Sequence, residues 1–188
     1  MTPRPWGLVL DADVLLRSSA RDLFLYLAAL GAIEPIWSDA ILAEVARNFP
    51  GGADRFQRLA TALDATFPGA RKADFEHRIP ALIRTHPKDR HVLALAAEYE
   101  SDLVSFNHRD FDNEEARHHG VRVWAPDDAM ARMIEAEPYE VRRAVERAWL
   151  MLRQPAIAWT DYVDHIRRDG FPTVAAWAGG LPEPQRTA

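Results

Sequence analysis

Polar side chains that could do chemistry stand near apolar runs at several separated places in this sequence. The set comprises Asp11, Glu44, Asp89, Asn107 and Asp110. Asp11 follows the apolar run at 6–10, and a carboxylate at the end of a buried strand is unfavourable unless something pairs with it. Oxygen ligands from separate segments are what Mg²⁺ or Mn²⁺ prefers, and such ions activate water and stabilise charge on a scissile phosphate. The residue types therefore indicate metal-assisted chemistry on a phosphate ester.

The weaker members of this set each have an ordinary structural explanation. Asp89 stands at the start of a predicted helix, where an acidic residue commonly caps backbone N–H groups. Glu44 could be a solvated acid on a helix whose apolar side carries Ile41 and Val45. Asp110 could simply organise a turn. The sequence alone leaves both interpretations open.

The cysteine and histidine content limits which kinds of catalytic or metal site this chain can form. The chain of 188 residues contains no cysteine, which excludes a disulfide scaffold, a thiolate-bound metal and a thiol nucleophile. Its seven histidines include no pair four residues apart, so zinc is a poor second choice. His91 could reach the site from its place beside Asp89, or it could serve packing.

The net charge of the chain bears on whether it can bind nucleic acid. Lysine and arginine number 23 against 28 acids, a net charge of −5, so the chain as a whole does not attract a phosphate backbone. If nucleic acid is the substrate, metal ions or a local arginine patch must offset the repulsion. One predicted helix offers such a patch in Arg142, Arg143, Arg147 and Arg153. The alternative is a solvated helix face balanced by Glu140 and Glu146.

The elements that would position these residues alternate between strands and helices. Short apolar runs predict strands at 6–10, 102–106 and 121–124. Apolar periodicity and capping residues predict helices at 20–30, 39–48, 56–67, 90–98 and 114–119, with a further helix at 75–83. This alternation predicts an α/β fold with a parallel sheet, in which ligands bind beyond the carboxyl ends of the strands.

The pattern changes after Pro126. No further strand is visible, and helices are predicted at 127–136, 138–153, 159–168 and 172–178. We therefore predict two domains, an α/β domain over 1–126 and an all-helical C-terminal extension over 127–188.

Successive blocks of the first domain resemble those of a PIN domain. They read VLDADVLLRSSARDLFLYLA, WSDAILAEVARN and HPKDRHVLALAAEYESDLVSFNHRDF. The likeness runs from about Leu8 to Pro126 and is nearest to the VapC-like toxins of bacterial toxin–antitoxin pairs. It implies a three-layer α/β/α fold with a short parallel sheet, and a metal-dependent endoribonuclease that cleaves single-stranded RNA with metal-activated water.

Roles follow from the resemblance position by position. Asp11, Glu44 and Asp89 match the acids that hold Mg²⁺ or Mn²⁺. Asn107 falls where many PIN domains have a fourth acid, and Asp110 is the aspartate of the turn that follows. The sequence departs from the family at Asn107 and at Asp13, which stands where asparagine, threonine or cysteine is common. The neutral Asn107 puts a second metal in doubt, although its carbonyl oxygen can still accept a water or reach a metal.

Two other functions compete with this interpretation. A phosphatase of the haloacid-dehalogenase type would use Asp11 as nucleophile and Asp13 as general acid, with Ser105 and the pair Asp127 and Asp128 in its later motifs. That interpretation leaves Glu44 and the DRHVLA block unexplained. An inactive PIN-like module that binds RNA or protein is favoured by Asn107. It is disfavoured by three converging carboxylates, which repel one another without a cation.

The partners expected from the resemblance are single-stranded RNA and an antitoxin protein whose arginine would enter the acidic groove. A homodimer through the apolar helix at 20–30 is a further expectation. No apolar run reaches the ~18 residues of a membrane span, and the N-terminus reaches charge too early for a signal peptide. We therefore expect a cytoplasmic protein without a membrane partner.

Overall fold

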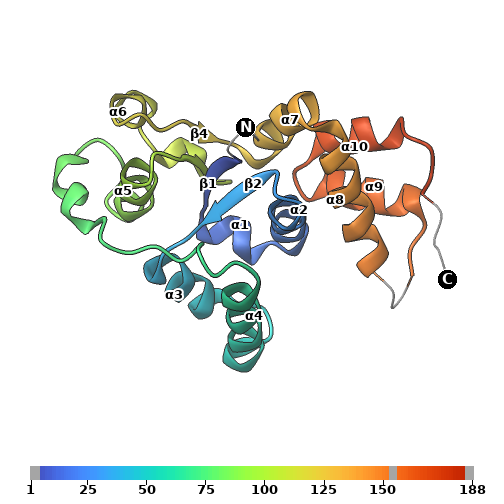
Figure 1. Ribbon diagram of the computed structural model, residues 1–188, viewed down its shortest axis with the longest axis horizontal. Coiled ribbons are helices and arrows are strands. Elements are labelled where there is room, and N and C mark those ends of the chain that lie inside the picture. The colour runs from blue at the N-terminus through green and yellow to red at the C-terminus, as the bar shows by residue number, and fades with distance from the viewer. Residues whose placement is uncertain (1–4, 153–155, 185–188) are drawn as a thin grey trace. The chain divides into compact units, whose positions relative to one another are not determined.

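A four-stranded parallel sheet forms the centre of the α/β part of this protein. The computed structural model describes residues 5–152 and 156–184, so Arg153 of the predicted basic face lies outside the described residues. The strands are β1 (Trp6–Leu10), β2 (Ile33–Ile36), β3 (Asp102–Val104) and β4 (Val123–Trp124), in the order β2-β1-β3-β4 (Figure 1). The predicted α/β class with a parallel sheet is confirmed.

Strand β2 is the element that the sequence pattern missed. It has four residues and contains Pro35, which pairs with Leu8 of β1. Proline is tolerated in a strand at the edge of a sheet because it has no N–H to donate to a further neighbour. The edge position in the order β2-β1-β3-β4 therefore explains how so short a proline-containing run becomes a strand.

The helices around the sheet follow the predicted order with a few differences. They are α1 (Ala12–Leu16), α3 (Asp39–Asn48), α4 (Gly52–Thr66), α5 (Arg90–Glu98) and α6 (Asn113–His118), with short 3₁₀ turns η1 (Glu76–Ala81) and η2 (His108–Asp110). Helix α1 was not predicted, and the segment predicted as a helix at 75–83 is the 3₁₀ turn η1. Pro80 inside η1 lacks the N–H that an α-helix needs.

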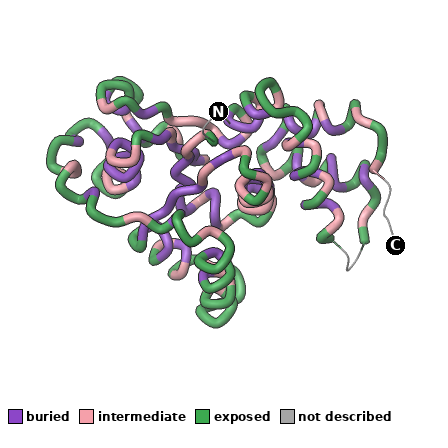
Figure 2. The backbone as a smooth tube through the Cα atoms, viewed as in Figure 1, coloured by how far each residue is buried: buried purple, intermediate pink, exposed green. Residues whose placement is uncertain are grey.

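The core of this part lies around the central strand β1. Leu8, Val9 and Leu10 are fully buried. The run 92–97 of α5, which packs against β1 and β3, is buried as well. Figure 2 shows this buried interior, whereas α4 is exposed over most of its surface and buries only Ala60 and Leu63. Strand β1 therefore lies in the buried interior, between its neighbouring strands and against α5.

The described chain divides into two compact units that differ from the predicted domains in one segment. The first unit holds residues 5–17 and 33–125, and the second holds 18–32 and 126–184. One boundary between the units falls at Pro126. Residues 18–32, which we had placed in the first domain, cluster with the C-terminal helices instead.

The second unit is built mainly of helices. It contains α2 (Ser18–Ala29), α7 (Pro126–Ala136), α8 (Pro138–Met151), α9 (Trp159–Arg168) and α10 (Pro172–Gly179). Helix α2 packs against α8, and its apolar residues Leu23, Phe24 and Leu27 are fully buried. This corrects the expectation that the apolar face of the 20–30 helix is free to form a dimer. Among the described residues, no helix has the length and apolar character needed to cross a bilayer.

Candidate functional site

Asp11 occupies the point where β1 gives way to α1. Its backbone N–H extends the sheet by donating to the carbonyl oxygen of Val104 at 3.1 Å. Its carboxylate caps α1 by accepting the N–H of Ala12 at 2.7 Å, and the residue is only 7% exposed. The strand end thus places a nearly buried carboxylate at the carboxyl edge of the sheet, as the sequence predicted.

The surroundings of Asp11 favour its neutral form. Burial and the neighbouring carboxylates of Asp13 and Glu44 raise its pKa to about 7, against the opposing effect of hydrogen bonds from Ser105 and Ala12. Burial is the largest of these influences. A carboxyl group with this pKa carries a proton for much of the time near neutral pH, unless a cation compensates its charge.

Glu44 reaches the same region from α3. Ser38 begins this helix by accepting the N–H of Ile41 at 3.3 Å, and Ile41, Leu42 and Val45 bury its apolar side. Glu44 lies at the margin of that side and is half-buried. Its charge raises the pKa of Asp11 and also that of Asp89, so this one carboxylate is electrostatically linked to both other predicted metal ligands.

Asp89 stands at the N-cap position of α5 but does not act as a cap. Its backbone is in the right-handed helical region at φ −102° and ψ −5°, and its side chain makes no capping hydrogen bond. The carboxylate lies 3.5 Å from Nδ1 of His86 instead. Burial, Asp110 and Glu44 raise its pKa, while His86 and His91 lower it. The capping explanation considered for Asp89 is therefore wrong.

A groove of about 740 Å³ brings the predicted residues together. Its lining includes Glu44, Asp89, Asn107 and Asp110, and the remaining members are Ala40, Ala43, Arg47, Asn48, His86, Lys88 and His91. Asp11 is not part of the lining, being buried, and is linked to it through the charge of Glu44. Arg47 and Lys88 add positive charge to a wall that otherwise carries carboxylates. The groove can therefore contact a phosphate as well as a cation.

The turn after β3 is held in place by Asp13. Its carboxylate accepts the N–H of Phe106 at 3.2 Å, the N–H of Asn107 at 3.0 Å and the hydroxyl of Ser105 at 3.2 Å. The same turn leads into η2 and Asp110, whose carbonyl oxygen accepts the N–H of His86 at 3.2 Å. The structure thus gives Asp13 a positioning role that sequence reasoning had not assigned.

His91 is the lining residue whose chemistry the sequence left undecided. Its Nδ1 lies 2.7 Å from the carbonyl oxygen of Lys88, which can only accept, so Nδ1 carries the proton and Nε2 of the neutral ring presents a lone pair. Nε2 is buried and has no hydrogen-bond partner within the described residues. An imidazole oriented in this way by a backbone carbonyl is typical of metal-binding histidines. The sequence signal was the spacing of His91 two residues after Asp89.

The fit of a divalent cation can be tested on these observations. The carboxylates of Asp11 and Asp89, whose pKa values burial and the charge of Glu44 raise, form with an unpartnered imidazole nitrogen a donor set suited to Mg²⁺ or Mn²⁺. In the described part of the chain, no three such side chains stand close enough around one point to hold an ion as they are placed. A bound cation would therefore have to draw the carboxylates together.

Comparison with known proteins adds no further assignment. No family model, no curated protein and no solved structure matches the chain.

Proposed function

We propose that this protein is a PIN-like, metal-dependent endoribonuclease that cleaves single-stranded RNA. The observation that carries the proposal is the placement of Glu44 and Asp89 in one groove, with the nearly buried Asp11 linked to that groove through the charge of Glu44. Such an arrangement is unfavourable unless a cation is bound, because like charges repel and burial disfavours the charged form.

Different residues of the groove and its surroundings would bind the cation and the RNA. Asp11, Glu44 and Asp89 would hold Mg²⁺ or Mn²⁺, which makes water more acidic and offsets negative charge on a phosphate. Asn107 and Asp110 line the same groove and could orient water through their side-chain oxygens. Arg47 and Lys88 would attract the RNA backbone, which the net charge of −5 does not.

The phosphatase alternative loses support at two positions. Asp13, which would be its general acid, already accepts hydrogen bonds from Ser105, Phe106 and Asn107. Asp127, from its last motif, accepts the backbone N–H groups of Thr173 at 3.0 Å and Val174 at 3.3 Å. Both carboxylates thus accept hydrogen bonds from the backbone, which disfavours a role for either in proton transfer or metal binding.

A toxin of this class would need an inhibitor. We propose an antitoxin protein whose arginine enters the groove and pairs with Glu44 and Asp89, because a guanidinium forms paired hydrogen bonds with carboxylates. The pKa of Asp89 is raised first by burial and then by the charges of Asp110 and Glu44, and such a pairing would also compensate that repulsion.

Cleavage of short single-stranded RNAs tests the nuclease proposal. The wild type is incubated with Mg²⁺, Mn²⁺ or EDTA beside Asp11→Asn, Asp89→Asn and the control Asp54→Asn, whose exposed carboxylate lies on α4 outside the groove. We expect metal-dependent cleavage that is lost in the first two variants and kept in the third. Turnover of p-nitrophenyl phosphate that survives Asp89→Asn, without RNA cleavage, would favour the phosphatase. Absence of both activities and of Mn²⁺ binding by calorimetry would favour the binding module.

A further inference from the structure

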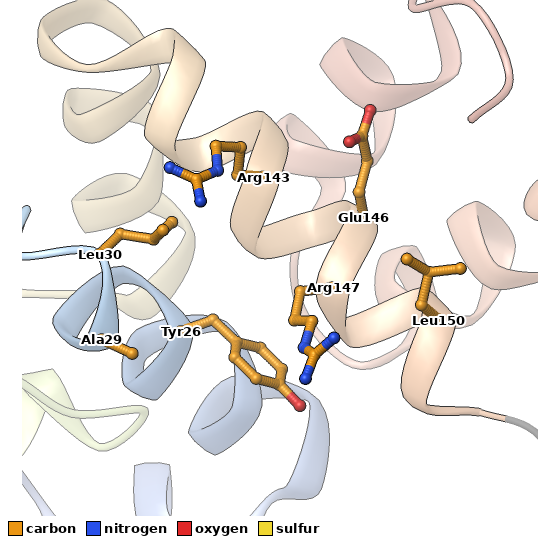
Figure 3. A pocket seen from close by; sticks show the side chains of 7 residues that line it. All are labelled: Tyr26, Ala29, Leu30, Arg143, Glu146, Arg147 and Leu150. Atoms are coloured by element: carbon orange, nitrogen blue, oxygen red, sulfur yellow. The ribbon is translucent and has the colours of Figure 1, made fainter. Parts of the chain in front are cut away.

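A second recess, separate from the acidic groove, lies within the helical unit between α2 and α8. It measures about 350 Å³ and is lined by Tyr26, Ala29, Leu30, Arg143, Glu146, Arg147 and Leu150 (Figure 3). The spacing of these residues places Tyr26 and Ala29 on one face of α2, with Leu30 directly after its end, and the other four on one face of α8. A volume of this size falls at the lower end of the range for small-ligand pockets.

The charge in this recess is positive. Within the described residues, neither Arg143 nor Arg147 forms an ion pair with a carboxylate, and both are exposed. The one acid in the lining, Glu146, is already paired with Nε of Arg142 at 2.7 Å. Figure 3 shows the Glu146 carboxylate pointing away from Tyr26, while the Arg147 guanidinium is directed toward the ring of Tyr26. An anion would therefore meet two available guanidinium groups.

Aromatic and aliphatic side chains lie beside the two arginines of the recess. Tyr26 is half-buried beside Leu30, and Leu150 adds aliphatic surface from α8. One turn before Arg143, Tyr139 is 66% exposed and lies under the Arg143 guanidinium, with 5.7 Å from the guanidinium carbon to the ring centroid. Aromatic rings alternating with arginines are the lining that proteins use for unpaired nucleic-acid strands, since bases stack on rings and phosphates pair with guanidinium groups.

We propose that this recess, with Tyr139 at its rim, binds one nucleotide unit of a single-stranded RNA. The phosphate would lie between Arg143 and Arg147, and the base would lie against Tyr26 and Leu30. The recess would thereby supply the local arginine patch that a chain of net charge −5 needs in order to hold RNA. An acidic peptide would use the arginines but would gain less from the tyrosines, which is why RNA is the favoured occupant.

This inference rests on RNA being the substrate, but it can be tested without cleavage. Binding of a fluorescent single-stranded RNA is measured by anisotropy in EDTA. The variants are Arg143→Gln/Arg147→Gln and, as a control with the same change in net charge, Arg167→Gln/Arg168→Gln on α9. Tyr139→Leu tests stacking at an exposed position where folding is little affected. Circular dichroism verifies that each variant is folded.

We expect the pocket pair to weaken RNA binding about tenfold and to reduce the slope of log affinity against log salt by about 0.7, as expected for one lost phosphate contact on a single strand. Tyr139→Leu should weaken binding about fivefold, because a stacked base is lost. The α9 pair should stay within about twofold of the wild type. If both arginine pairs weaken RNA binding equally, or if neither pair weakens it, the proposal is overturned. It is also overturned if the pocket binds a poly-glutamate peptide more tightly than the RNA.

Cleavage by the same proteins separates this proposal from the proposed nuclease function. If the wild type cleaves RNA with Mn²⁺ and the pocket pair binds and cleaves equally well, the pocket proposal fails and the nuclease stands. If the wild type binds RNA through the pocket but never cleaves it, the pocket stands and the nuclease fails. Free AMP and UMP as competitors measure how much of the affinity comes from a single nucleotide.

Discussion

The carboxylate of Asp13 accepts the backbone N–H of Asn107 at a distance of 3.0 Å, across 94 residues of sequence. This hydrogen bond joins the segment after β1 to the turn after β3, and the two segments carry Asp11 on one side and Asn107 on the other. The relative placement of these two candidate site residues therefore depends on a third residue that takes no part in the proposed chemistry.

Replacing Asp13 should loosen this connection. Asp13→Ala leaves the N–H groups of Phe106 and Asn107 without their acceptor, and we expect the free energy of unfolding to fall by about 2 kcal/mol. Urea denaturation at pH 7 measures the change, with the exposed Asp161→Ala as control. A loss no larger than that of the control would show that the turn is held by other contacts.

Glu115 anchors the segment that leads into the groove. Its nearly buried carboxylate accepts the backbone N–H groups of Ile83 at 2.7 Å, Arg84 at 2.9 Å and Thr85 at 2.7 Å. Burial on its own would raise the pKa of Glu115, but the hydrogen bonds outweigh it and hold the pKa at about 2, below the ordinary 4.5. We expect Glu115→Gln to lower the free energy of unfolding by about 2 kcal/mol at pH 7. Its neighbour Glu114→Gln, which loses only an exposed ion pair with Arg84, should change it by less than about 1 kcal/mol.

The effect of Glu115 should depend on pH in a defined direction. Because its pKa is lowered on folding, the stabilisation is present above pH 4.5 and is lost as the pH falls toward 2. The difference in unfolding free energy between wild type and Glu115→Gln should therefore shrink between pH 4.5 and pH 2.5. A difference that stays constant over this range would contradict the hydrogen bonds described.

Asp11 should act in the opposite direction and in a different pH window. Its pKa is raised from 3.8 to about 7, so the folded protein keeps a proton that the unfolded chain has lost. Rising pH therefore favours unfolding between pH 4 and pH 7, by up to roughly 4 kcal/mol for this group alone. Asp11→Asn, which cannot ionise, should gain stability relative to the wild type as the pH rises from 4.5 to 8 in EDTA. Parallel pH profiles for the two proteins would refute the raised pKa.

Much of the fold could be predicted because its signals are local. The apolar run ending in Asp11 defines β1, and Ser38 caps α3 through the N–H of Ile41 as its type and position indicate. Helix α5 has the bounds that its apolar periodicity predicted, Arg90 to Glu98. Strand β2 was missed because a four-residue run with Pro35 becomes a strand only when β1 is beside it.

The sequence indicated which residues would lie near one another, but not the contacts that hold them there. Glu44, Asp89, Asn107 and Asp110 do line one groove, since parallel strands place their carboxyl ends at one edge. Whether Asp89 caps its helix was decided by backbone angles that the sequence does not specify. The positioning role of Asp13 depends on hydrogen-bond partners more than 90 residues away in the sequence, which no local pattern predicts. Long-range contacts also assign residues 18–32 to the helical unit.

His91 offers the sharpest separation between a structural and a functional role. Its Nδ1–H is used by the carbonyl oxygen of Lys88, and its buried Nε2 has no partner among the described residues. His91→Asn keeps an N–H donor near the position of Nδ1 and removes Nε2, whereas His91→Gln keeps a polar group near Nε2. If Nε2 serves a bound cation, Asn should weaken Mn²⁺ binding about tenfold by calorimetry, and Gln should weaken it less. Thermal unfolding in EDTA should favour the Asn variant, which retains the hydrogen bond to Lys88. If Mn²⁺ binding instead follows thermal stability across the two variants, the role of His91 is packing.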